Sequence, residues 1–146
     1  MIGIILVTHG RLALDFIEAL EHIVGRQDNI KAICIENYED VEASQQAIIN
    51  ASESMNEGEG VLIISDVFGS TPANITLDMV DKKDVIVLSG VNLPLLVKVD
   101  ALRREPKHKR CLRDIAMEAC EAGRKGICFA STLLEQIHPK TQTHKP

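Results

Sequence analysis

The sequence predicts a single α/β domain built on a doubly wound, mostly parallel sheet with helices on both faces. Short apolar runs typical of buried strands recur along the chain, stretches with a helical hydrophobic period separate them, and polar residues follow several of the runs. Alternating strands and helices form βαβ units, whose crossovers are almost always right-handed. The order of the elements therefore favours a doubly wound domain.

Composition agrees with this class and excludes several functions. The 146 residues are 45% hydrophobic and 25% charged, which suits one domain with a substantial core. A net charge of −5, with three Phe, one Tyr and no Trp, argues against nucleic-acid binding. The N-terminal apolar run is too short for a signal peptide or a membrane span, so we expect a cytoplasmic protein. The four cysteines lack metal-site spacing and are expected to be free thiols.

The first half of the chain supplies three predicted strands and the two helices between them. The strands are apolar runs rich in β-branched residues, as in the buried strands of parallel sheets: residues 2–7, 30–35 and 60–65. Apolar residues recur with a 3.6-residue period over residues 12–24, and Gly25 is a stop signal. Asp40 is a candidate cap for a second helix over residues 41–55.

The second half continues the alternation and ends in a polar tail. Predicted elements are a strand at 85–88, helices at 93–102 and 109–122 with Gly123 as a stop, and a short fifth strand at 126–130. Residues 131–146 are set apart as a C-terminal tail, which we expect to be loosely ordered from Glu135. The basic stretch at 103–113 is either a solvated connection or a docking patch for an acidic partner.

Polar residues follow the first and third strands. Thr8, His9 and Gly10 end the first strand, and Asp66 ends the third. If these strands are neighbours, the sheet order is 2-1-3-4, and His9 and Asp66 face the crevice where the order reverses. A carboxylate beside a histidine accepts the Nδ1 proton and leaves the Nε2 lone pair as a nucleophile.

A helix start lies just beyond Asp66. Gly69 and Ser70 allow a tight turn, and Thr71 followed by Pro72 is typical of an N-cap and the first helical position. Backbone amides at such a helix start favour anions. A histidine, a carboxylate and an anion-binding turn at one sheet edge together predict phosphoryl chemistry.

Three motifs, at residues 8–10, 66–74 and 90–94, resemble the IIA domain of the mannose family of the bacterial phosphoenolpyruvate-dependent sugar phosphotransferase system (PTS). The resemblance covers about residues 1 to 130. It implies that His9 accepts a phosphoryl group from phospho-HPr at Nε2 and passes it to a IIB partner, and that Asp66 holds the ring of His9. It further implies these phosphoryl-binding residues: Gly10, Phe68, Gly69, Ser70, Thr71 and Asn92.

The same resemblance implies a homodimer in which a final antiparallel strand, residues 126–130, is exchanged between subunits, with no metal and no cofactor. Ser70 stands where the family often has glycine, so it would be strained if the position needs a positive φ. No IIB domain follows in this sequence, so we expect a separate IIB protein as acceptor.

Two alternatives remain open at this point. The same phosphohistidine could serve a regulatory switch without sugar transport, because a phosphoryl group changes the charge of a docking surface. A flavodoxin-like ligand-binding domain is the other alternative. The scarcity of aromatic residues and the lack of a G-x-x-x-x-G-K-[ST] loop argue against it.

Overall fold

A computed structural model describes residues 1–36, 40–106 and 109–138 of the chain. In these residues four parallel strands form one sheet of order β2-β1-β3-β4, as predicted from the sequence. The strands are β1 (Gly3–His9), β2 (Ile30–Ile35), β3 (Val61–Ser65) and β4 (Val85–Ser89). The helices are α1 (Leu12–Val24), α2 (Val41–Met55), α3 (Thr71–Leu77), α4 (Leu93–Arg103), α5 (Leu112–Lys125) and α6 (Ala130–Ile137).

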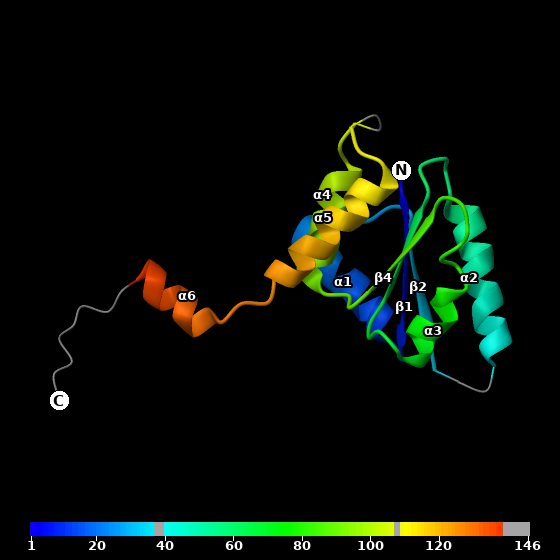
Figure 1. Ribbon diagram of the computed structural model, residues 1–146, viewed down its shortest axis with the longest axis horizontal. Coiled ribbons are helices and arrows are strands. Elements are labelled where there is room, and N and C mark those ends of the chain that lie inside the picture. Colours follow the sequence, from blue (N-terminus) through cyan, green and yellow to red (C-terminus); the bar gives the residue numbers. More distant parts are fainter. Residues whose placement is uncertain (37–39, 107–108, 139–146) are drawn as a thin grey trace.

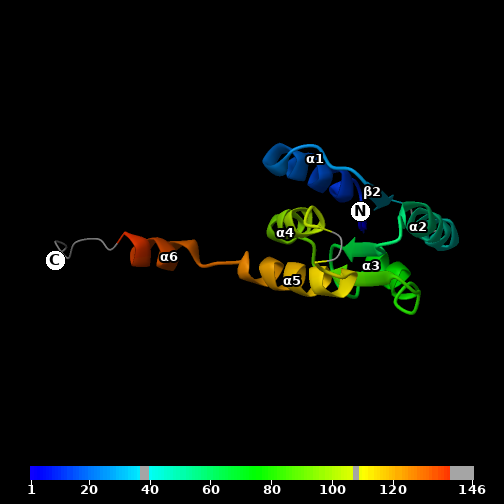
Figure 2. The same ribbon diagram turned by 90° about the horizontal axis from the view of Figure 1, so that it is seen from above.

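Helices cover both faces of the sheet, with α1, α4 and α5 on one face and α2 and α3 on the other (Figures 1 and 2). Successive side chains of a strand point to opposite faces. Ile4 and Leu6 of β1 therefore join the core with α1, α4 and α5, while Ile5 and Val7 join the core with α2 and α3. This two-sided burial explains the unbroken apolar run at the start of the sequence.

The edge strand β4 differs from the central strands. Every residue of β3 is buried, whereas every residue of β4 is only partly buried. Among the described strands β4 pairs with β3 alone, so its outer edge carries no strand in the described part of this chain.

Helix α5 runs past the predicted stop at Gly123 and ends at Lys125, with Gly126 as its C-cap. Gly123 is buried against α4, and a Cβ atom there would lie 3.1 Å from the Cβ of Leu95. This glycine therefore serves close helix packing, and the prediction of a helix end was wrong.

The predicted fifth strand at residues 126–130 is not a strand in this chain. Gly126 caps α5, residues 127–129 have no regular structure, and Ala130 begins α6. A strand needs a hydrogen-bonded neighbour, and this segment projects away from the sheet of its own chain (Figure 1). Residues 135–137, expected to be loosely ordered, are helical, and residues 139–146 lie outside the described part.

The basic stretch at 103–113 is largely engaged within the fold. Arg103 is only 6% exposed, and its guanidinium donates hydrogen bonds to the backbone oxygens of Ile2 and Asn29 and to Gln27. Arg110 forms ion pairs with Glu105 and Glu118. Residues 107 and 108 lie outside the described part, so the docking alternative stays a hypothesis for that portion.

Among the described residues, no helix is both long and apolar enough to span a lipid bilayer. All four cysteines, Cys34, Cys111, Cys120 and Cys128, carry free thiols.

Candidate functional site

The candidate site lies at the carboxyl ends of β1 and β3. These strands are hydrogen-bonded neighbours, with Val7 opposite Ser65. His9 therefore stands two residues beyond this pair on β1, and Asp66 one residue beyond it on the chain leaving β3. The sheet order reverses between these strands, because β2 lies on the other side of β1 and β4 on the other side of β3. Ligand sites of open α/β sheets are found at such a position.

Asp66 and His9 are joined by two contacts to one carboxylate oxygen. The backbone N–H of His9 donates to Asp66 Oδ2 at 2.9 Å, and the ring Nδ1 lies 2.6 Å from the same oxygen. An ionised carboxylate only accepts hydrogen bonds, so Nδ1 carries the proton and Nε2 the lone pair. The Asp66 side chain is 8% exposed and that of His9 43% exposed. The geometry fixes the ring and leaves it accessible from outside.

Hydrogen bonds stabilise the ionised form of the Asp66 carboxyl group. Burial by itself raises the pKa of this carboxyl group, but N–H donors from the His9 backbone, the His9 ring and the Val67 backbone outweigh it, and the pKa of Asp66 falls below its usual value. Val67 N–H donates to Oδ1 at 2.8 Å. The carboxylate is therefore ionised at neutral pH and able to stabilise a positive imidazole ring.

The turn after Asp66 is closed by Ser70. Its hydroxyl donates to the carbonyl of Val67 at 2.6 Å and accepts from Ala73 N–H at 3.4 Å. Ser70 is thus the N-cap of α3, one residue before the cap predicted at Thr71, which is the first residue of the helix. Gly69 takes the positive φ of 84°, whereas Ser70 has a φ of −78° and is not strained.

Thr8 is a functional neighbour that the sequence reasoning did not single out. Its buried hydroxyl accepts the N–H of Ala13 at 2.7 Å and so supports the first turn of α1. Gly10 has a φ of 49°, which favours glycine, and its N–H donates to the carbonyl of Ile35. These contacts fix the chain on either side of His9. A hydroxyl residue directly before the candidate histidine, at the end of an apolar run, was the available sequence signal.

Two of the residues to which the resemblance assigns phosphoryl binding, Asn92 and Phe68, have side chains that are engaged within the fold or exposed to solvent. Asn92 uses both ends of its side chain within the fold: Oδ1 accepts from Leu95 N–H and Nδ2 donates to the carbonyl of Gly123, both at 2.9 Å. Phe68 points its ring to the outside and is 76% exposed. An aromatic ring offers a phosphoryl group no hydrogen bond, so only the backbone of Phe68 could serve in that role.

The His9 side chain is partly exposed at the surface. Five grooves on the described part of the chain are lined by other residues, and neither His9 nor Asp66 lines any of them. Among the described residues, no group of three or more His, Cys, Asp or Glu side chains is arranged to hold a metal ion.

Comparison with known proteins relates this geometry to a family. Residues 3–116 match the family model described as "PTS system fructose IIA component". The chain is 28% identical over 143 residues to the fructose-specific EIIA component of the PTS from Bacillus subtilis, covering 97% of this chain and 95% of the relative. It is 36% identical over 97 residues to the sorbose-specific EIIA component from Lacticaseibacillus casei, covering 66% and 70% of the two chains.

Two further relatives bear on chain length and fold. The mannose-specific EIIAB component from Escherichia coli is 28% identical over 127 residues, which cover 86% of this chain but only 38% of that protein. The crystal structure of a phosphotransferase system component EIIA from Streptococcus agalactiae superposes with a TM-score of 0.76 at 27% identity, covering 90% of this chain and 99% of the other.

Proposed function

The chain belongs to the mannose/fructose family of PTS IIA components, and from this premise we propose that it carries a phosphoryl group on His9. The donor is phospho-HPr and the acceptor is a histidine of a IIB protein, with sugar uptake as the endpoint. The observation that carries the proposal is the 2.6 Å contact between Asp66 Oδ2 and the Nδ1 of an accessible histidine. This contact orients the nucleophile.

Phosphoryl transfer follows from this arrangement without a cofactor. The Nε2 lone pair attacks the phosphorus of the donor phosphohistidine, the donor's N–P bond breaks, and its electron pair returns to the donor imidazole. The proton stays on Nδ1, hydrogen-bonded to Asp66, so the positively charged ring faces a carboxylate. Transfer to the IIB histidine is the same step in reverse, with His9 as the leaving group. The turn at Gly69, Ser70 and Thr71 lies on this edge and supports a role in holding the phosphoryl oxygens.

Intact-mass analysis tests this function. Wild-type protein is incubated with phosphoenolpyruvate, enzyme I and HPr, beside His9→Ala and the control His22→Ala, whose histidine lies on α1 outside the site. We expect one acid-labile phosphoryl adduct on wild type and on His22→Ala and none on His9→Ala. An adduct on His9→Ala, or none on wild type while a known IIA protein is phosphorylated in the same mixture, would contradict the proposal.

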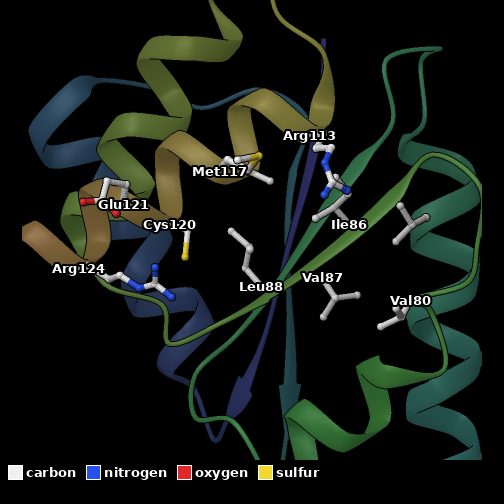
Figure 3. Close-up of a pocket in the computed structure, with 11 residues that line it drawn as sticks. Val80, Ile86, Val87, Leu88, Arg113, Met117, Cys120, Glu121 and Arg124 are labelled. Atoms are coloured by element: carbon white, nitrogen blue, oxygen red, sulfur yellow. The ribbon is translucent and has the colours of Figure 1, made fainter.

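The proposed functional unit is a homodimer in which residues 126–130 of one subunit add an antiparallel strand to β4 of the other. A groove of about 590 Å³ runs along β4, with Met117 and Cys120 of α5 on one side and Val80 on the other (Figure 3). Ile127 and Phe129 of the projecting segment are 80% and 77% exposed. Exposed apolar side chains and a sheet edge that carries no strand among the described residues are complementary, and pairing them between two copies satisfies both.

Sedimentation equilibrium tests the dimer. We expect Ile127→Asp to shift the protein to the monomer, because a carboxylate would replace an apolar side chain that packs against the valine, isoleucine and leucine side chains of the groove. Ile23→Asp is the matched control: this isoleucine is 57% exposed at the end of α1 and should leave the assembly unchanged. Equal masses for wild type and Ile127→Asp would argue against exchange of this segment.

A further inference from the structure

The loop that follows Asp66 presents two apolar side chains to the outside. Val67 is 59% exposed and Phe68 is 76% exposed, and neither belongs to the two hydrophobic cores of the described chain. In these exposed positions the two side chains contribute little to the stability of the fold. Large exposed apolar residues beside a reactive group are typical of a surface that a partner covers.

This loop is held in one shape by hydrogen bonds. Val67 N–H donates to Asp66 Oδ1 at 2.8 Å, and the Val67 carbonyl accepts from both the hydroxyl and the N–H of Ser70, at 2.6 and 3.2 Å. Gly69 supplies the left-handed residue that closes the turn. The turn fixes the backbone that carries Phe68, so binding of a partner would cost this loop little backbone freedom. Exposed aromatic residues on such a backbone are typical anchors in protein interfaces.

The position of the loop ties it to the reaction. Asp66 contacts His9 directly, and Val67 and Phe68 are the next two residues of the chain. A donor protein must bring its phosphorus to bonding distance of Nε2, so its surface covers the residues that surround His9.

We propose that Phe68, with Val67 beside it, is the docking anchor for the phosphohistidine protein that delivers the phosphoryl group to His9. The inference rests on the proposed carrier function and names the contact through which the donor is recognised. The Phe68 ring thus has a docking role in place of the phosphoryl-binding role that the resemblance implied for this residue. It contacts the donor protein and does not touch the phosphorus.

The experiment compares a protein donor with a small one. Potassium phosphoramidate transfers its phosphoryl group to Nε2 with release of ammonia and needs no docking surface. We expect Phe68→Ala to lower kcat/KM with phospho-HPr about tenfold or more, chiefly through KM, and to do so at least tenfold more than it lowers the rate with phosphoramidate. Phe68→Leu should recover part of the loss. Ile23→Ala, an exposed residue at the far end of α1, should change neither rate.

The results that would contradict the docking anchor, the donor and the carrier function differ from one another. A change of less than twofold with phospho-HPr, or an equal fall with both donors, would overturn the anchor and leave the carrier function standing. Wild type that reacts with phosphoramidate but not with phospho-HPr would overturn HPr as the donor and with it the anchor. Failure of wild type with both donors would overturn the carrier function itself.

Discussion

The two edges of the sheet use charged side chains in opposite ways. At the amino edge, Arg103 is 6% exposed and donates to the carbonyls of Ile2 and Asn29, which precede β1 and β2, and to Gln27. At the carboxyl edge, Asp66 is buried but its partner, the His9 side chain, is 43% exposed. The guanidinium is surrounded by the fold, whereas the imidazole lies partly at the surface. The side chain that stabilises the fold is thus enclosed by its partners, while the candidate nucleophile is oriented by Asp66 and stays accessible.

Removal of the amino-edge contacts should have the largest effect. Arg103→Met removes the buried donor to the Ile2 carbonyl and to the Gln27 side chain, and we expect the free energy of unfolding to fall by about 3 kcal/mol. The matched control is Lys125→Met, because Lys125 is 76% exposed and pairs with Glu121 at the surface, where a loss of under about 1 kcal/mol is expected. Urea unfolding measures both. Equal losses would contradict the structural role assigned to Arg103.

A substitution at the carboxyl edge should lower the rate of phosphoryl acceptance by His9. Asp66→Asn removes the charge that faces the imidazole ring, and we expect phosphoryl acceptance to slow by roughly 10²-fold, equivalent to about 2.7 kcal/mol of activation free energy. Asp78→Asn, an exposed aspartate that follows α3, is the control. Quenched-flow measurements with phosphoramidate isolate the chemical step from docking. A rate within twofold of wild type would show that Asp66 does not orient His9.

The smallest expected effect is a pH dependence of stability. The folded pKa of Asp66 lies below its usual value of about 4, so its stabilising contribution is fully present above that pH and is lost as the pH falls through the folded pKa. The stability difference between wild type and Asp66→Asn should therefore narrow below about pH 4. Thermal unfolding of both proteins across this range measures it. A stability difference that increases as the pH falls below about 4 would contradict this prediction.

Much of the fold followed from local patterns. The apolar runs around Leu6 and Ile63 are buried on both faces, which only the central strands of a parallel sheet allow. The polar ends of neighbouring parallel strands must meet at one edge, so His9 and Asp66 were predicted to lie together if the first and third strands are neighbours, as the family resemblance also implied. The chemical role of the pair stays a prediction until phosphorylation is measured.

Other features depended on contacts that no local pattern records. Gly123 reads as a helix stop, but it packs against α4 and the helix continues. Arg103 reads as a surface charge, but the carbonyls it binds belong to residues far away in the sequence. Ser70 rather than Thr71 caps α3, because its hydroxyl also closes the turn onto Val67.

The sequence by itself determined which segments form the buried strands and which polar residues follow them, because burial requires apolar runs and leaves polar residues at strand ends. Tertiary structure decided the rest. The segment around Ile127 and Phe129 has the composition of a strand, yet composition cannot supply a hydrogen-bonded neighbour, and within this chain the segment has none among the described residues. A segment becomes a strand only when a sheet edge supplies its backbone hydrogen bonds, so the structure of this segment depends on the edge beside which it lies.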